Sequence, residues 1–357
     1  MEPAPAFSLT GLPPRPGAAG DEPDLTRRGV VLHLDGDRDG ARAAYEAALA
    51  DDPTSASAHN NLGFLLAQEG RWDEAVSHYQ RALELRPDST MALANMGIAR
   101  ASQGNVEEGM RLLREAVDVE PRNTLAWDNL ARLALLQGDA AGAERAWQAA
   151  VELEPDDPEL LTSLATVQAA RGARDQATSL LRRAIECDPA YAPAWSRLGT
   201  LSFLRQDLGV ATDALERALE LAPADTDARH QLAMVLLARG RRPDAKAQLE
   251  AILAQAPDHA SAAIDLGIYA LADGDAQAAL ARLAPLAAAP DAGPRIRFYH
   301  AVALDMVGRR EEADPLLRAL AAQGAPRYSE RAREYLGERQ GGADAAGRRD
   351  ADAHAGN

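Results

Sequence analysis

Residues 56–89 read ASAHNNLGFLLAQEGRWDEAVSHYQRALELRPDS, and this stretch of 34 residues decides the fold. It holds two apolar-patterned segments, with Gly70 between them and Pro87 after the second. Glycine ends a helix at low cost because it adopts positive φ, and proline stops a helix because it lacks an N–H donor. The stretch therefore predicts a helix, a short turn, a second helix and another turn.

The same pattern recurs along most of the chain. Prolines stand at a constant spacing of 34 residues, at Pro53, Pro87, Pro121, Pro155, Pro189, Pro223 and Pro257. Ten positions after each proline comes a small residue, preceded by leucine or methionine; the small residues are Gly63, Gly97, Ala131, Ala165, Gly199, Ala233 and Gly267. A small side chain at this place lets the paired helix approach closely. A fixed period of this length predicts a repeat array built from one supersecondary unit.

These columns resemble those of the tetratricopeptide repeat family, which has the same period and the same Leu-Gly, Ala and Pro spacing. The resemblance implies an all-α, right-handed α-solenoid superhelix of about nine helix-turn-helix units with a C-terminal capping helix. Full units are expected at 56–89, 90–123, 124–157, 158–191, 192–225 and 226–259, and degenerate ones at 22–55, 260–293 and 294–327. We expect a disordered arm at 1–21, the capping helix at 328–337 and a disordered tail at 338–357.

Two prolines interrupt the last units. Pro285 and Pro315 fall inside the second helices expected for units eight and nine. An internal proline removes a hydrogen bond and clashes with the preceding turn, so each should kink or shorten its helix.

The amino-acid composition limits the kinds of ligand that the chain is expected to bind. The net charge of −16 argues against a nucleic-acid or anionic-membrane ligand, since both select basic surfaces. Of 38 basic residues Lys246 is the only lysine, which suggests the arginine bias of a bacterial GC-rich genome. A single cysteine, Cys187, permits no internal disulfide. With no apolar run of membrane-spanning length and no secretory leader, we expect a cytoplasmic protein.

Catalytic, cofactor and metal motifs do not emerge, so we expect a non-enzymatic chain without a cofactor. One segment does match the calcium-loop pattern D-x-D-x-D-G-x5-E, from Asp35 to Glu46. In the repeat register, however, the same residues form the turn of unit one, and its second helix begins near Arg38 or Asp39. That start denies the loop its ligand geometry, so an acidic turn is the favoured interpretation and a calcium site the alternative.

The resemblance places the functional surface on the concave face lined by first helices. Three asparagines, Asn61, Asn95 and Asn129, recur there at one-repeat spacing. They resemble the asparagine ladder of O-GlcNAc transferase repeats, although asparagine is common at this place in the family. We expect their amides to face solvent and bind an extended peptide, and Arg132 and Arg197 to select a carboxylate. The candidate partner-binding residues are Asn60, Asn61, Asn95, Asp128, Asn129, Arg132, Ser163, Thr166, Arg197, Gln231, Met234 and Asp265.

An apolar stretch on the same face of units six to eight has two interpretations. Met234, Leu237, Ile264, Ile268 and Leu271 suit either helix packing or the seat of an amphipathic partner helix. The sequence as a whole predicts a non-catalytic scaffold or adaptor for a peptide or protein partner, with no nucleic acid and no membrane. The alternative is a regulatory or substrate-presenting subunit of an enzyme, such as a transferase or kinase, on a separate chain.

Overall fold

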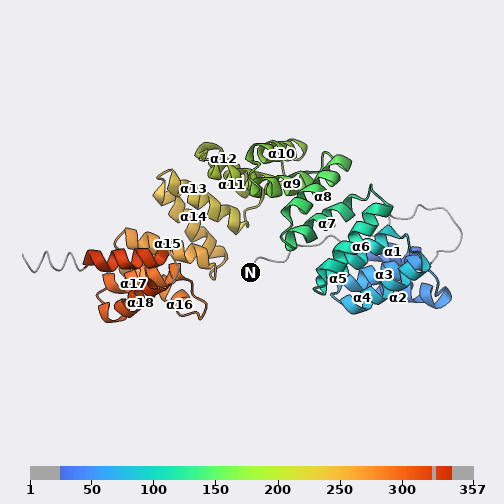
Figure 1. Ribbon diagram of the computed structural model, residues 1–357, viewed down its shortest axis with the longest axis horizontal. Coiled ribbons are helices and arrows are strands. Elements are labelled where there is room, and N and C mark those ends of the chain that lie inside the picture. The colour runs from blue at the N-terminus through green and yellow to red at the C-terminus, as the bar shows by residue number, and fades with distance from the viewer. Residues whose placement is uncertain (1–24, 324–326, 340–357) are drawn as a thin grey trace, which may run out of the picture. The chain divides into compact units, whose positions relative to one another are not determined.

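The computed structural model describes residues 25–323 and 327–339, which form helices joined by short turns (Figure 1). Within these ranges there is no strand, so the all-α prediction is confirmed. The arm expected at 1–21 lies outside the described residues, as does the tail from 340 onward.

In the described ranges nine helix pairs follow one another along the chain. The first helices of the pairs are α1 (Leu25–Leu34), α3 (Ala56–Gln68), α5 (Thr90–Ser102), α7 (Thr124–Leu136), α9 (Pro158–Ala170), α11 (Ala192–Leu204), α13 (Thr226–Ala238), α15 (Ala260–Ala272) and α17 (Pro294–Met306). The second helices are α2 (Arg38–Asp51), α4 (Trp72–Leu85), α6 (Val106–Val119), α8 (Ala140–Leu153), α10 (Arg174–Cys187), α12 (Leu208–Leu221), α14 (Arg242–Gln255), α16 (Ala276–Ala287) and α18 (Arg310–Ala322).

The chain divides into two units, which we call unit 1 (up to Leu201) and unit 2 (from Ser202). In each unit a helix packs against its partner in the pair and against the first helix of the following pair. The core consists of the small and aliphatic columns predicted from the sequence, with aromatic anchors such as Tyr45 and Tyr79 fully buried.

Glycine fixes both the turns and the helix crossings. Gly70 has a φ of 74°, as the turn after α3 requires, and other turns repeat this conformation. Gln206 takes the same position in the sixth pair, with a φ of 64°. At the α5–α6 crossing, a Cβ on Gly109 would lie 2.6 Å from the backbone oxygen of Gly97. The two helices therefore approach to a distance that no larger residue tolerates.

The prolines shorten the last second helices, as predicted. Pro285 lies inside α16 and Pro315 inside α18, which have 12 and 13 residues. The second helices before them, from α2 to α14, have 14 each. The loss of length agrees with the missing donor of each proline.

A last helix at 327–339 closes the hydrophobic core of unit 2 and is longer at both ends than the expected 328–337. Ala332 is fully buried, and Tyr328, Tyr335 and Leu336 pack against the cluster that contains Phe298. The Tyr335 hydroxyl donates a hydrogen bond of 2.9 Å to Asp305. An amphipathic terminal helix of this kind shields the apolar end that a repeat array otherwise exposes.

Candidate functional site

A pocket of about 300 Å³ lies among the first helices of unit 1. Four of the predicted site residues, Arg132, Ser163, Thr166 and Arg197, line it together. The remaining lining residues are Leu135, Trp147, Glu159, Thr162, Tyr191 and Pro193. Side chains from α7, α9 and α11 meet there because the repeat places the same helix face at each step.

The carboxylate of Asp128 organises the floor of this pocket and is itself buried. Its Oδ1 accepts a hydrogen bond of 2.7 Å from the indole N–H of Trp147. Its Oδ2 accepts one of 2.8 Å from Arg132, whose Nη2 donates to Glu159 at 2.7 Å. Arg132 is thus held between two carboxylates of the same chain, and its predicted role in selecting a ligand carboxylate is disfavoured.

Arg197 differs from Arg132 because its side chain is exposed and has no hydrogen-bond or ion-pair partner among the described residues. Tyr191 lies beside it, and burial, followed by the charges of Glu159 and Asp157, raises the pKa of this phenol to about 12. The tyrosine therefore stays a neutral donor at neutral pH. A cation and a neutral phenol on one wall suit an anionic ligand group.

A buried hydroxyl in the same pocket also lacks a partner. Thr162 is 6% exposed, and its Oγ1 forms no hydrogen bond within the described part of the chain. The neighbouring Thr166 donates instead to the backbone oxygen of Thr162 at 2.8 Å. An unsatisfied buried hydroxyl costs about 1–3 kcal/mol, which a ligand group in the pocket can recover.

The expectation that the asparagine ladder faces solvent is wrong. Asn60, Asn61, Asn95 and Asn129 are all buried. The Asn60 amide donates to Asn61 at 3.2 Å, and Asn95 donates to Asn60 at 3.3 Å, which links α3 to α5. Asn129 donates to the backbone oxygen of Leu125 at 2.9 Å. These amides therefore bond to the protein itself, and the bond between Asn95 and Asn60 joins one first helix to the next.

The predicted site residues in unit 2 lie apart from this pocket along the chain, and one of them is already paired. Asp265 is buried, accepts a hydrogen bond of 2.7 Å from His230 and forms an ion pair with Arg295. Gln231 and Met234 are half-buried, and Met234 packs on the cluster around Leu249.

Helix packing accounts for most of the apolar stretch. Ile264 is buried in the cluster that includes Leu283, and Ile268 and Leu271 pack against the same cluster. Leu237 packs against the neighbouring cluster around Leu215. These contacts favour the packing interpretation over a seat for a partner helix.

The segment with the calcium-loop pattern forms a helix start, as the repeat register predicts. Helix α2 begins at Arg38, and the carboxylate of Asp37 accepts a hydrogen bond of 2.9 Å from the Gly40 N–H. In the described ranges no three His, Cys, Asp or Glu side chains gather in a metal-binding group. Asp37 therefore acts as an N-cap, which explains the acidic residue without a metal.

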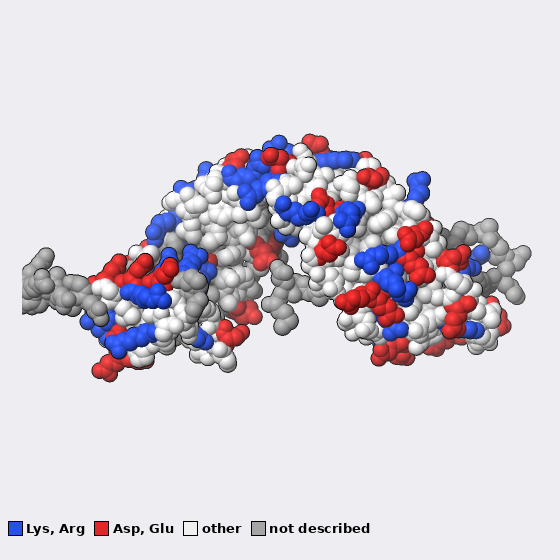
Figure 2. All heavy atoms as spheres, viewed as in Figure 1, with Lys and Arg blue, Asp and Glu red and all other residues white. Residues whose placement is uncertain are grey.

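Acidic and basic side chains are interleaved on the visible face of each unit (Figure 2). Many form local pairs, such as Arg81 with Glu84 at 2.7 Å and Arg217 with Glu220 at 2.7 Å. Exposed pairs of this kind contribute little to stability, about 0–1 kcal/mol each. Among the described helices, none combines the length and the apolar character needed to cross a membrane.

Comparison with known families identifies the repeat. A sequence model of the C-terminal domain of cilia and flagella-associated protein 70, a tetratricopeptide repeat domain, matches residues 15–234, more than half of the chain. The chain belongs to this tetratricopeptide repeat family. A second model, described as tetratricopeptide repeat, matches residues 203–266. No curated protein matches the chain.

Solved tetratricopeptide repeat structures share the fold at low sequence identity. The APC/C hetero-tetramer Cut9–Hcn1 is 20% identical, with a TM-score of 0.54 over 67% of this chain and 47% of that one. The C-terminal part of a repeat protein from Cytophaga hutchinsonii is 16% identical, with a TM-score of 0.53 over 66% and 97%. PilF of Pseudomonas aeruginosa is 21% identical, with a TM-score of 0.51 over 56% and 90%. At these identities the likeness shows the fold alone.

Sequence reasoning missed Thr162, Tyr191 and Glu159 in the pocket. Tyr191 lies in the turn before α11, outside the first-helix columns that guided the prediction. Glu159 is the second residue of α9, where an acidic side chain is expected for its helix dipole alone. Thr162 is one residue before the predicted Ser163, and only the structure shows that its hydroxyl is unsatisfied.

Proposed function

We propose that this tetratricopeptide repeat protein is a non-catalytic scaffold that binds a peptide or partner protein on the first-helix face of unit 1. The observation that carries the proposal is the pocket in which the unpaired Arg197 and the unsatisfied hydroxyl of Thr162 meet. Both groups are suited to a ligand that brings hydrogen-bond acceptors and a negative charge. The chemistry of the pocket favours an acidic side chain or a terminal carboxylate.

The binding energy would come mainly from the guanidinium of Arg197. A hydrogen bond to a charged group contributes about 1.5–3 kcal/mol, which corresponds to roughly 10- to 100-fold in affinity. The wall formed by Tyr191 and Pro193 adds apolar contact area. Because Arg132 is already paired with Asp128 and Glu159, it positions the floor and leaves Arg197 as the recognising cation.

The remaining aspects of the predicted role follow from the same proposal. A soluble adaptor of a bacterial cytoplasm that takes protein partners agrees with the net charge of −16, which disfavours nucleic acids. The buried Asn95, which donates to Asn60, then serves to hold the first helices α3 and α5 in register.

Panning a random-peptide display library against the full chain tests this function. Peptides enriched on the wild-type protein should carry a carboxylate, and fluorescence anisotropy should show a loss of affinity of tenfold or more in Arg197→Ala. Arg174→Ala is the matched control, because Arg174 is an exposed arginine outside the pocket, on the second helix α10. Equal loss in both variants, or none in Arg197→Ala, contradicts the proposed site.

A further inference from the structure

Two apolar columns of the repeat meet at the junction between one pair and the next. The second helices carry a large aliphatic residue at the same position in seven consecutive units, at Leu49, Leu83, Val117, Val151, Ile185, Leu219 and Leu253. Thirteen positions later, the first helix of the following unit carries Leu62, Met96, Leu130, Leu164, Leu198, Leu232 or Leu266. Within unit 2, Leu219 shares a core cluster with Leu232, and Leu253 shares one with Leu266.

Both columns are broken at the junction between α16 and α17. The aliphatic position of the second helix is occupied by Ala287, and the leucine position of the following first helix by His300. The junction therefore loses two large apolar side chains at once. At the α6–α7 junction, where Val117 and Leu130 keep both columns intact, the pocket measures about 270 Å³. At the α16–α17 junction the pocket is larger, about 480 Å³, and both Ala287 and His300 line it.

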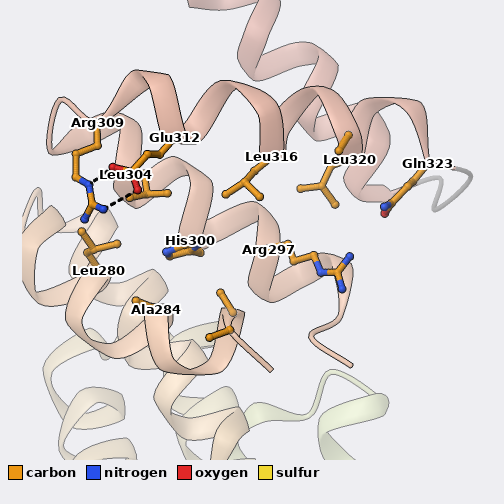
Figure 3. A pocket seen from close by; sticks show the side chains of 13 residues that line it. Leu280, Ala284, Arg297, His300, Leu304, Arg309, Glu312, Leu316, Leu320 and Gln323 are labelled. Atoms are coloured by element: carbon orange, nitrogen blue, oxygen red, sulfur yellow. Dashed lines mark hydrogen bonds and ion pairs between the residues drawn. The ribbon is translucent and has the colours of Figure 1, made fainter. Parts of the chain in front are cut away.

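The walls of this pocket are apolar (Figure 3). Leu316 and Leu320 extend from α18 toward α17, and Ala284 and Leu280 lie opposite them on α16. His300 is central in the view, on the α17 floor. An accessible cavity lined by leucine and alanine favours an aliphatic guest, because removing apolar surface from water is favourable.

The two ends of the pocket differ in charge. At one end Arg309 donates two hydrogen bonds of 2.6 Å to the carboxylate of Glu312. At the other end Arg297 lies near Gln323 (Figure 3), and its guanidinium has no hydrogen-bond or ion-pair partner in the described ranges. Burial, followed by the charge of Arg309, lowers the pKa of His300, so its ring is neutral at neutral pH. Among the described lining residues, Arg297 is therefore the one cation left to pair with a ligand.

We propose that this pocket is a second binding site, which accepts a leucine-sized side chain next to a carboxylate on a partner peptide. The aliphatic side chain takes the space that the broken columns leave between Ala287 and His300. The carboxylate pairs with Arg297 at the open end. The site lies on the second-helix side of unit 2 and is independent of the pocket at Arg197.

N-acetyl-leucine is the smallest probe that combines both groups, and NMR titration of the full chain detects weak binding. We expect it to shift the ring resonances of His300, assigned by comparison with His300→Gln. N-acetyl-alanine lacks the aliphatic bulk and N-acetyl-leucinamide lacks the charge, so each should bind at least tenfold more weakly. A peptide that ends in leucine should likewise bind better than its amidated form.

Two variants place the binding in this pocket. Ala287→Leu restores the column of the preceding repeats, so it should fold, fill the pocket and abolish the shift at His300. Arg297→Ala should leave the pocket open and remove the preference for the acid over the amide. Arg318→Ala changes an exposed arginine of α18 that does not line the pocket, and Arg197→Ala changes the other site. Both should bind N-acetyl-leucine as the wild type does.

Four outcomes overturn the proposal. Binding of N-acetyl-leucine that Ala287→Leu leaves unchanged, or no binding at all, removes the pocket as a site. Equal affinity for acid and amide removes the role of Arg297. Self-association of the chain that Ala287→Leu abolishes identifies a second copy as the occupant.

Discussion

Replacing Asp128 with alanine tests whether the floor of the unit 1 pocket depends on one buried carboxylate. The substitution removes the acceptor of the Trp147 indole N–H, 2.7 Å away, and one of the two partners of Arg132, 2.8 Å away. A buried donor left without an acceptor costs about 1–3 kcal/mol. Arg132 keeps Glu159 at 2.7 Å, which limits the additional loss. We therefore expect Asp128→Ala to lower the free energy of unfolding by about 2–4 kcal/mol in total.

The loss should be local, because the stability of a repeat array is a sum of repeat and nearest-neighbour contributions. Hydrogen exchange followed by mass spectrometry should show faster exchange in α7, α8 and α9 and little change in α1–α4. Trp147→Phe removes the indole donor together with the five-membered ring, so its cost combines the lost hydrogen bond with a small cavity. Asp213→Ala, at an exposed position of α12, is the matched control and should change nothing.

A double-mutant cycle separates the hydrogen bond from the general loss of packing. We expect a coupling energy between Asp128 and Trp147 of about 0.5–3 kcal/mol. A loss below about 1 kcal/mol for Asp128→Ala, or additive effects of the two substitutions, would refute the reasoning that the carboxylate organises the floor.

Three further substitutions and a pH titration probe other parts of the array. Gly109→Ala should destabilise the α5–α6 pair by more than 1 kcal/mol in urea denaturation, because the new Cβ would lie 2.6 Å from the backbone oxygen of Gly97. The control is Gly209→Ala, where the atom nearest to the new Cβ is 3.8 Å away, and it should be neutral or stabilising. Asn95→Ala should lose about 1–3 kcal/mol because it leaves the Asn60 amide oxygen unpaired, and an unchanged melting temperature would contradict the inter-helix role of the asparagines. His59 and His78 face each other through their Nδ1 atoms at 3.0 Å, and burial is the first cause that lowers the pKa of both rings. The folded pKa of each ring lies below the ordinary value of about 6.5, so the unfolded chain binds more protons than the folded chain as the pH falls. The contribution of the two rings to folding stability should therefore be fully present above pH ~6.5 and decrease at lower pH. The double variant His59→Gln/His78→Gln should flatten this dependence between about pH 7.5 and 5.

The sequence predicts the helix pairs almost completely, because one column of prolines and one of small residues determine where every helix starts, crosses and stops. It also predicts part of the lining of the candidate pocket, because Arg132, Ser163, Thr166 and Arg197 recur on one helix face and line one pocket. The recurrence could not show that Arg132 is occupied by Asp128 and Glu159, since pairing depends on rotamers and on the neighbouring repeat.

Exposure is the property that periodicity predicts least well. Asn61 and Asn95 fall on the helix face that we expected to be open, yet the adjacent first helix covers them. The pocket at His300 was accessible to sequence reasoning, because Ala287 and His300 each break a column that holds in the units before them. A prediction built on the residues that fit the repeat overlooks positions such as Ala287 and His300 that depart from it.

The strained turn at Gln206 affects how the folded protein responds to proteases. An L-residue other than glycine in the left-handed region carries about 1–2 kcal/mol of strain, and Gln206 stands five residues after the end of unit 1. Strain in a repeat array stays where it arises, so among the turns of the described residues this one should open most readily and become accessible to a protease. Cleavage there would leave the pocket at Arg197 on one fragment and the pocket at His300 on the other, and so a single cut would separate the two proposed binding sites.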